Sequence, residues 1–291
     1  MDSTFLLHIF AYVVGAALLY TCGLVDDITC LGYQIKFAAQ ILSALSLCVG
    51  GLWIANFEHI LLIDSVPFWI GMPFTVFFVV YLTNAINLID GIDGLASGLS
   101  CISLVIITAL NLIAGNFIWA VFGLCFLGPV ATFFYYNVFS QKYKVFMGDT
   151  GSLSLGFLLS FLILHFWRDG LVWNTSMHNI GIVAISTVII PMLDVVRVMM
   201  SRLRDKRNPF LPDKNHIHHK LLRTGLSGHA TMLVILFASL SIIAINFLLA
   251  AYISQTLILI ADVVLYVLMH RVINHFIYKK EGKDSTWNRA L

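Results

Sequence analysis

The residues best suited to chemistry in this chain lie between Asn84 and Gly94. Two carboxamides, two carboxylates and two glycines stand there between apolar runs, in the order Asn84, Asn87, Asp90, Gly91, Asp93 and Gly94. On a helix, the two carboxamides and the two glycines share one arc of about 80°. The paired Asp-Gly steps predict that this helix breaks near Asp90. Such a helix end suits a diphosphate, a metal ion and a flat ring; the alternative is a polar turn between two helices.

Two adjacent carboxylates, Asp26 and Asp27, follow the first apolar run, and Lys36 comes nine residues later. Adjacent carboxylates repel each other, and they are tolerated where a cation or a proton-accepting role stabilises them. Lys36 can face the same pocket from the start of the next helix. The alternative is a pair of solvated aspartates beside a lysine that snorkels to the membrane surface.

A third motif, Phe146-Met-Gly-Asp149-Thr-Gly-Ser, opens a later apolar run. Glycines beside an aspartate at a helix N-terminus leave backbone N–H groups available to an anion. The Asp149 carboxylate could then hold Mg²⁺ against that anion. As a single motif this pattern is weak, because many turns have similar sequences.

A fourth motif is the histidine cluster His216, His218 and His219, which follows a basic loop containing Pro209 to Asp213. The cluster lacks cysteines and a spaced fourth ligand, so it is a poor zinc site. Histidines and lysines are better interpreted as donors to phosphate oxygens. The alternative is a basic loop that contacts anionic lipid headgroups.

Composition determines what must position these motifs. The chain of 291 residues is 59% hydrophobic and 11% charged, whereas a soluble domain carries roughly 25% charged residues. We therefore predict an all-α polytopic membrane protein, with residues 1–291 forming one membrane domain, because open sheet edges cannot lie in lipid. Nine apolar segments approach the ~20 residues that cross a bilayer. They are 5–24, 37–53, 68–89, 99–114, 117–136, 153–167, 180–200, 232–249 and 254–269, with kinks expected at Pro129 and Pro191.

The charges give this bundle an orientation. When the nine segments alternate across the membrane, all of the 17 Lys and Arg residues except Arg168 fall on one side. The positive-inside rule makes that side cytoplasmic. All four motifs fall on the same side, which predicts one site assembled from several loops.

Lone polar residues within the segments are interpreted as partners in hydrogen bonds between helices; these are Asn111, His165, Asn246 and Asp262.

Taken in series, the four motifs resemble the polyprenyl-phosphate N-acetylhexosamine-1-phosphate transferases of glycosyltransferase family 4. The resemblance extends from about Gly23 to Arg223. The His-x-His-His pattern after Pro209-Phe-x-Pro-Asp213 is closer to the branch of WecA and TagO than to that of MraY.

The resemblance implies transfer of a sugar-1-phosphate, by default GlcNAc-1-phosphate, from a UDP-sugar to undecaprenyl phosphate with release of UMP. It implies Mg²⁺, with Mn²⁺ as an alternative, between Asn87, Asp149 and the diphosphate. It further implies a site on the cytoplasmic face of a bacterial plasma membrane, no nucleic-acid partner, and compatibility with a homodimer. The implied roles place Asp26, Asp27 and Lys36 in catalysis and the following residues in substrate binding: Asn84, Asp90, Gly91, Asp93, Phe146, His216, His218 and His219.

One feature departs from the family pattern. Relatives of the WecA type begin with two further spans and a loop, so eleven spans are expected where nine are predicted here. This departure leaves a truncated inactive paralogue as one alternative to an active enzyme. A second is a polytopic transporter, since polytopic helical proteins often are transporters; its polar residues would gather near the membrane midplane. The sugar, the polysaccharide pathway and the prenyl chain length are not determined by the sequence.

Overall fold

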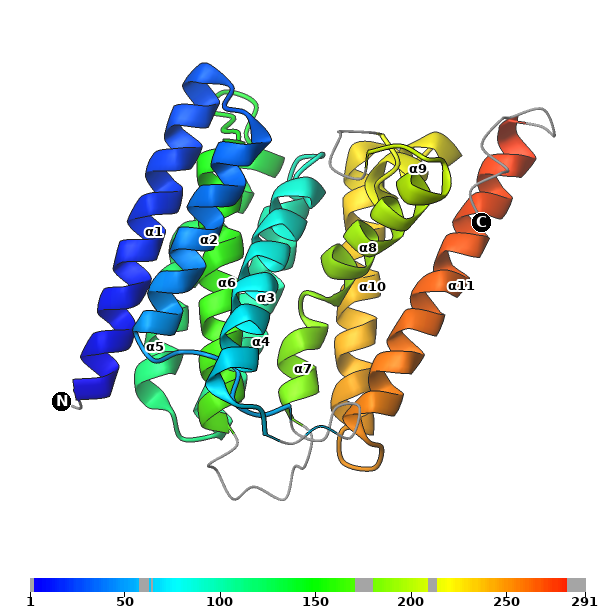
Figure 1. The fold of residues 1–291 in the computed structure, drawn as a ribbon. Helices are drawn as coiled ribbons and strands as arrows, with labels where there is room; N and C mark the ends of the chain where they lie inside the picture. Colours follow the sequence, from blue (N-terminus) through cyan, green and yellow to red (C-terminus); the bar gives the residue numbers. More distant parts are fainter. Residues whose placement is uncertain (1–2, 58–62, 64, 171–179, 209–213, 282–291) are drawn as a thin grey trace.

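The chain folds into a bundle of helices (Figure 1). The computed structural model describes residues 3–57, 63, 65–170, 180–208 and 214–281. These residues form eleven helices, which confirms the all-α prediction. They are α1 (Ser3–Thr29), α2 (Tyr33–Val49), α3 (Phe68–Ile89), α4 (Leu95–Ile113), α5 (Phe117–Val138), α6 (Gly148–Gly170), α7 (Gly181–Ser186), α8 (Ile189–Arg204), α9 (Ile217–Thr224), α10 (Gly228–Leu249) and α11 (Gln255–Glu281).

Seven of the described helices, α1, α3, α4, α5, α6, α10 and α11, are long and apolar enough to cross a membrane, and α2 is a shorter apolar helix of 17 residues. The chain is therefore a polytopic membrane protein. Eight of the nine predicted segments coincide with single helices. The remaining segment, 180–200, is not continuous, because it is divided between α7 and α8. Helix α9 lies in the basic loop and was not predicted.

The interruption between α7 and α8 has a local cause. Pro191 lies in the first turn of α8 and has no backbone N–H, and its ring clashes with a helical carbonyl four residues earlier, at Thr187. The Thr187 carbonyl instead accepts a hydrogen bond of 3.2 Å from the Ser103 hydroxyl of α4. A polar side chain from a neighbouring helix thus satisfies the backbone group that the proline releases. At Pro129, by contrast, α5 continues without a break.

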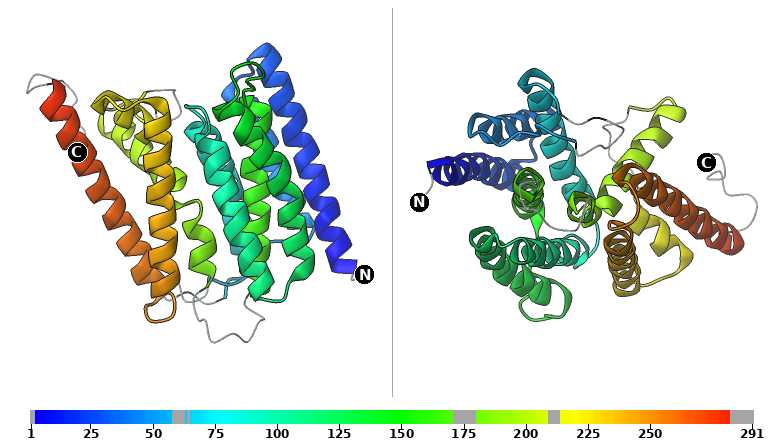
Figure 2. Two further views of the ribbon diagram at one scale, coloured as in Figure 1. Left: turned by 180° about the vertical axis from the view of Figure 1, so that it is seen from behind. Right: turned by 90° about the horizontal axis from the view of Figure 1, so that it is seen from below.

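Helix α6 lies at the centre of the first six helices and packs against α1, α3 and α4 (Figure 2). Its apolar window is 78% buried, compared with 28% for α1 and 22% for α5. Phe157 and Phe161 of α6 are fully buried, and the ring of Tyr12 from α1 packs on both. The middle of α6 is therefore packed tightly among its neighbours, of which α1 and α3 carry other motifs.

Two glycines allow the backbones of these helices to touch. A Cβ atom at Gly156 of α6 would lie 2.6 Å from Thr83 Cα of α3, and one at Gly23 of α1 would lie 2.5 Å from Thr150 Cα of α6. Small residues at helix interfaces permit such close approach in membranes. The contacts bring the C-terminal ends of α1 and α3 against the N-terminal end of α6.

The four motifs lie at one end of the bundle, the upper end in Figure 1, where α1 and α3 end and where α6 and α9 begin. Arg168 lies near the opposite end of α6. There its guanidinium donates to the Gly51 carbonyl at 2.9 Å and contacts the His8 ring at 2.8 Å. The fold therefore places Arg168 at the end of the bundle opposite to the four motifs, as the predicted distribution of Lys and Arg residues requires.

We expect Gly156→Ala to destabilise the bundle, because the added methyl group must push the α3 backbone away. The cost should be about 1–3 kcal/mol, typical of overpacking, and a lower thermal unfolding midpoint in detergent would report it. The matched control is Gly228→Ala at the exposed start of α10, where no heavy atom lies within 4 Å of the added carbon. Equal midpoints for the two variants would show that α3 and α6 are not packed this tightly.

Candidate active site

Lys36 joins two of the predicted motifs. Its ammonium group donates to Asp26 Oδ2 at 3.0 Å and to Asp149 Oδ2 at 2.7 Å. Asp26 comes from the last turn of α1, Lys36 from near the start of α2 and Asp149 from the first turn of α6. The side chains of Lys36 and Asp149 keep 25% and 26% of their surface exposed, so a ligand can reach them from solvent.

Asp27 caps α6 from the end of α1. Its carboxylate accepts hydrogen bonds from the Asp149 N–H at 2.8 Å, the Thr150 N–H at 3.1 Å and the Thr150 hydroxyl at 2.6 Å. The first amides of a helix lack partners within the helix, and an acidic side chain is a favourable acceptor for them. The sequence predicted an anion at this helix end; in the structure that position is filled by Asp27 itself.

Asn87 of α3 adds the second motif to this cluster. Its Nδ2 donates to the Ser152 hydroxyl at 2.8 Å, and Ser152 follows Asp149 by three residues on the same face of α6. Helix α3 ends at Ile89 with Asp90 as its C-cap, which confirms the predicted break. Burial and, to a smaller extent, the nearby charges of Asp149 and Asp93 together raise the pKa of Asp90 to about 6.

Asn84, one turn earlier on α3, has different partners. Its Nδ2 donates to Gln40 Oε1 of α2 and to the Val80 carbonyl, and its Oδ1 accepts from Gln40 Nε2 at 3.3 Å. Both ends of the amide therefore serve the pairing of α2 with α3. Its role in substrate binding stays a prediction.

Lys144, which the sequence analysis did not select, contacts both Asp93 and Phe146. The ammonium group of Lys144 lies 2.6 Å from Asp93 Oδ2 and 5.5 Å from the Phe146 ring centroid, and the Phe146 side chain is 75% exposed. Asn137 of α5 accepts a 2.6 Å bond from the Gly94 N–H, at a position where the backbone is left-handed (φ 77°). Lys144 lies two residues before Phe146 in the sequence, and this spacing is a signal from which its contact with the ring could be predicted.

His218 of the histidine cluster packs against Gly91 of the segment from Asn84 to Gly94. Its side chain is buried, and neither ring nitrogen has a hydrogen-bond partner within the described residues. A Cβ atom at Gly91 would lie 2.1 Å from its Nε2, so only glycine fits beside this ring. Burial and, to a smaller extent, the neighbouring His219 together lower the pKa of His218 to about 3. The ring is therefore neutral near pH 7 and can donate one N–H.

Asp194 of α8, which the sequence analysis also missed, holds the start of α9. Its buried carboxylate accepts from the Ile217 N–H at 3.0 Å, the Tyr266 hydroxyl at 2.9 Å and Arg197 Nη2 at 2.9 Å. His216 Nδ1 lies 2.7 Å from its other oxygen. A lone aspartate within an apolar run gave no local sign of this role. The network fixes the histidine cluster relative to α8 and α11.

The oxygen atoms in this cluster suit a hard divalent cation. Asp149 lies in the first turn of α6, and Asn87 contacts Ser152, three residues further along the same helix. The Oδ1 atom of Asp26, which shares Lys36 with Asp149, is buried without a hydrogen-bond partner among the described residues. Within that part of the chain, no group of three or more His, Cys, Asp or Glu residues is arranged to hold a metal. Mg²⁺ accepts amide, substrate and water oxygens beside one or two carboxylates, so the residues present fit it better than zinc.

We expect Asp194→Asn to destabilise the protein by about 3 kcal/mol, because removal of one partner leaves the Arg197 charge poorly compensated in a buried network. Thermal unfolding in detergent would measure the loss. The control is Asp205→Asn at the exposed C-cap of α8, which should change stability by less than ~0.5 kcal/mol. If both variants unfold at the wild-type temperature, Asp194 does not anchor α9.

The comparisons with known proteins agree with this geometry. A family model described as Glycosyl transferase family 4 matches residues 9–166, which carry three of the four motifs. A probable undecaprenyl-phosphate N-acetylglucosaminyl 1-phosphate transferase of Bacillus subtilis (strain 168) is 36% identical over 233 residues, which cover 77% of this chain and 61% of that protein.

Two further relatives are undecaprenyl-phosphate alpha-N-acetylglucosaminyl 1-phosphate transferases. The protein of Yersinia pestis is 30% identical over 239 residues, covering 80% of this chain and 63% of its own length. That of Escherichia coli (strain K12) is 30% identical over 249 residues, covering 83% and 65%. The chain thus spans less than two thirds of the length of these relatives. The family match and the identities over most of this chain show that it belongs to glycosyl transferase family 4.

Proposed function

We propose that the chain transfers GlcNAc-1-phosphate from UDP-GlcNAc to undecaprenyl phosphate and releases UMP, which initiates a lipid-linked cell-surface polysaccharide. The observation that carries the proposal is the contact of Lys36 with both Asp26 and Asp149, to which Asn87 is linked through Ser152. The names of the relatives supply the acceptor and the transferred group. UDP as the carrier follows from the family resemblance.

In this reaction, an oxygen of the lipid phosphate attacks the sugar-linked phosphorus of UDP-GlcNAc. The bond from that phosphorus to the bridging oxygen breaks, and UMP leaves with the oxygen. Phosphoryl transfer of this kind needs positioning and charge neutralisation more than covalent chemistry. Mg²⁺, or Mn²⁺ in its place, held by Asn87 and Asp149, would supply part of that neutralisation. Lys36 would supply the rest by donating to phosphate oxygens.

The geometry favours different roles for the two adjacent aspartates. All of the Asp27 contacts described above stabilise the start of α6, so we assign Asp27 to positioning Asp149. Asp26 has one oxygen on Lys36 and another without a partner in the described residues. We therefore assign Asp26 to the acceptor phosphate, as the group that orients it and takes its proton.

The remaining residues divide into two subsites. Asp93 and Phe146, with Lys144 between them, offer an acceptor and an exposed ring to a uracil base. The neutral ring of His218, beside Gly91, offers an N–H to the sugar or the diphosphate. The loop from Pro209 to Asp213, which belongs to the same motif, lies outside the described residues. The Lys and Arg distribution supports placing both subsites on the cytoplasmic side.

The proposal is tested by incubating the purified chain with radiolabelled UDP-GlcNAc and undecaprenyl phosphate. We expect label in the butanol-extractable lipid, UMP in equal amount, and loss of both when EDTA removes divalent cations. A parallel screen with other UDP-N-acetylhexosamines would define the sugar. Uptake of label into sealed vesicles without a lipid product would favour a transporter. Binding of UDP-GlcNAc without turnover would favour an inactive relative.

In the same assay, Asp149→Asn should lower kcat by a factor of ~10² or more, because it removes a full negative charge from the proposed cation site. The unfolding temperature should stay near that of the wild type, since Asp27 still caps the helix. Asp205→Asn, an exposed aspartate at the same end of the bundle, is the matched control and should keep its rate. Wild-type turnover in Asp149→Asn would exclude Asp149 as a metal ligand.

A further inference from the structure

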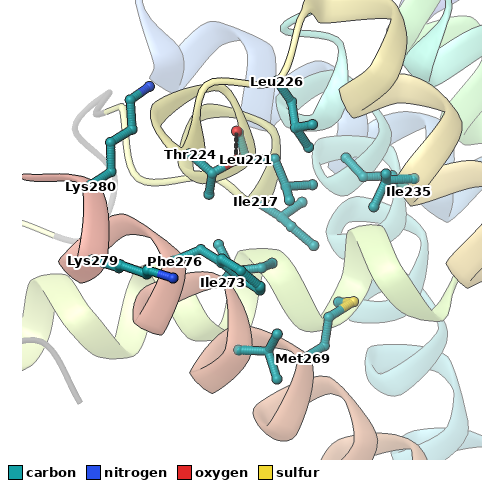
Figure 3. A pocket seen from close by; sticks show the side chains of 12 residues that line it. Ile217, Leu221, Thr224, Leu226, Ile235, Met269, Ile273, Phe276, Lys279 and Lys280 are labelled. Carbon is teal, nitrogen blue, oxygen red and sulfur yellow. Dashed lines mark hydrogen bonds between the residues drawn. The ribbon is translucent and has the colours of Figure 1, made fainter.

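A pocket of about 670 Å³ lies between α9, α10 and α11 (Figure 3). None of the candidate active-site residues described above lines it. Its volume falls in the range of ordinary ligand pockets, roughly 300–1,000 Å³. The side chains at its floor, Ile217 and Ile235, are fully buried, whereas Val272 and Phe276 at its rim are 56% and 54% exposed. The pocket is therefore a groove with an apolar floor that opens at the side of the bundle.

The opening faces the lipid bilayer near one membrane surface. Helices α10 and α11, which form its walls, are both long and apolar enough to cross a membrane. The 27 residues of α11 extend about 40 Å, which exceeds the ~30 Å of the hydrocarbon core. The last turn of α11 therefore reaches the headgroup region, and the groove runs from that turn toward the bilayer interior along Phe276, Ile273 and Met269.

Two lysines stand at the headgroup end of this groove. Lys279 and Lys280 both line it, and Figure 3 shows them on α11 beside the apolar floor. Neither ammonium group has an ion-pair partner in the described part of the chain. The adjacent acidic residue, Glu281, is paired with Arg223, whose Nε lies 3.0 Å from its carboxylate. Positive charge at one end of an apolar groove is complementary to a ligand with an anionic head and a hydrocarbon tail.

We propose that this groove binds an anionic phospholipid, with an acyl chain in the groove and the phosphate against Lys279 and Lys280. The undecaprenyl acceptor is a poorer occupant, because its phosphate must reach Asp26, Lys36 and Asp149, and none of these lines the groove. Ile217 and Leu221 of α9 form part of the floor, while His218 on the same short helix packs against Gly91. The bound lipid therefore braces the helix that carries the histidine cluster.

The test is native mass spectrometry of the full chain in detergent, titrated with phosphatidylglycerol or with phosphatidylcholine. We expect one tightly bound phosphatidylglycerol and at least ten-fold weaker binding of phosphatidylcholine. The double variant Lys279→Ser/Lys280→Ser should lose that preference. Val272→Trp, which fills the exposed rim without altering the floor, should block binding of both lipids. A phosphatidylglycerol with a photoreactive acyl chain should crosslink to Leu221, Val234 or Phe276.

Matched controls separate the site from general effects of charge and bulk. Lys142→Ser removes a lysine at the same end of the bundle, and Leu257→Trp adds bulk to an exposed position at the far end of α11. Both should bind phosphatidylglycerol as the wild type does. Equal binding of the two phospholipids, or crosslinks spread evenly along α11, would overturn the proposal. Displacement of phosphatidylglycerol by equimolar undecaprenyl phosphate would also overturn it, by assigning the groove to the acceptor.

Discussion

The site depends on one interaction, the capping of α6 by an aspartate from another helix. The N-terminus of a helix carries partial positive charge and unpaired amides. Asp27 of α1 satisfies two of these amides and the Thr150 hydroxyl. This contact fixes the direction in which Asp149 leaves the first turn of α6. It also places the preceding residue, Asp26, within reach of Lys36.

The start of a second helix, α9, is also capped by an aspartate from another helix. Asp194 of α8 accepts from the Ile217 N–H at the start of α9, as Asp27 does at the start of α6. Asp27 belongs to a helix distant in sequence from the one that it caps, whereas Asp194 belongs to the helix that directly precedes α9. Arg197 pairs with the capping carboxylate of Asp194 itself, whereas Lys36 pairs with Asp26, the residue before the capping Asp27. Both helix ends that carry site residues are therefore located by carboxylates from neighbouring helices, and not by their own loops.

The arrangement of the motifs followed from the sequence because each motif lies at the end of an apolar segment. Alternation of the segments then placed all of them at one end, and in the structure Lys36 contacts Asp149 of another motif. The roles of Asp194 and Lys144 could not be derived in this way. Their partners lie on other elements, and hydropathy specifies only which residues lie inside. The break at Pro191 was underestimated as a kink, because the hydroxyl of Ser103 that stabilises it is invisible in the local pattern.

Asn84 shows why a shared helix face is not enough to define the members of such a site. It lies on the same arc of α3 as Asn87 but about 4.5 Å deeper, at a rise of 1.5 Å per residue. At that depth it meets Gln40 of α2 instead of the polar end of α6. Amides at this level pair with each other across helices. Still deeper groups do the same, since Asn246 donates to Asp262 at 2.8 Å. In a membrane bundle, depth along the helix therefore separates residues that can meet a substrate from residues that join helices.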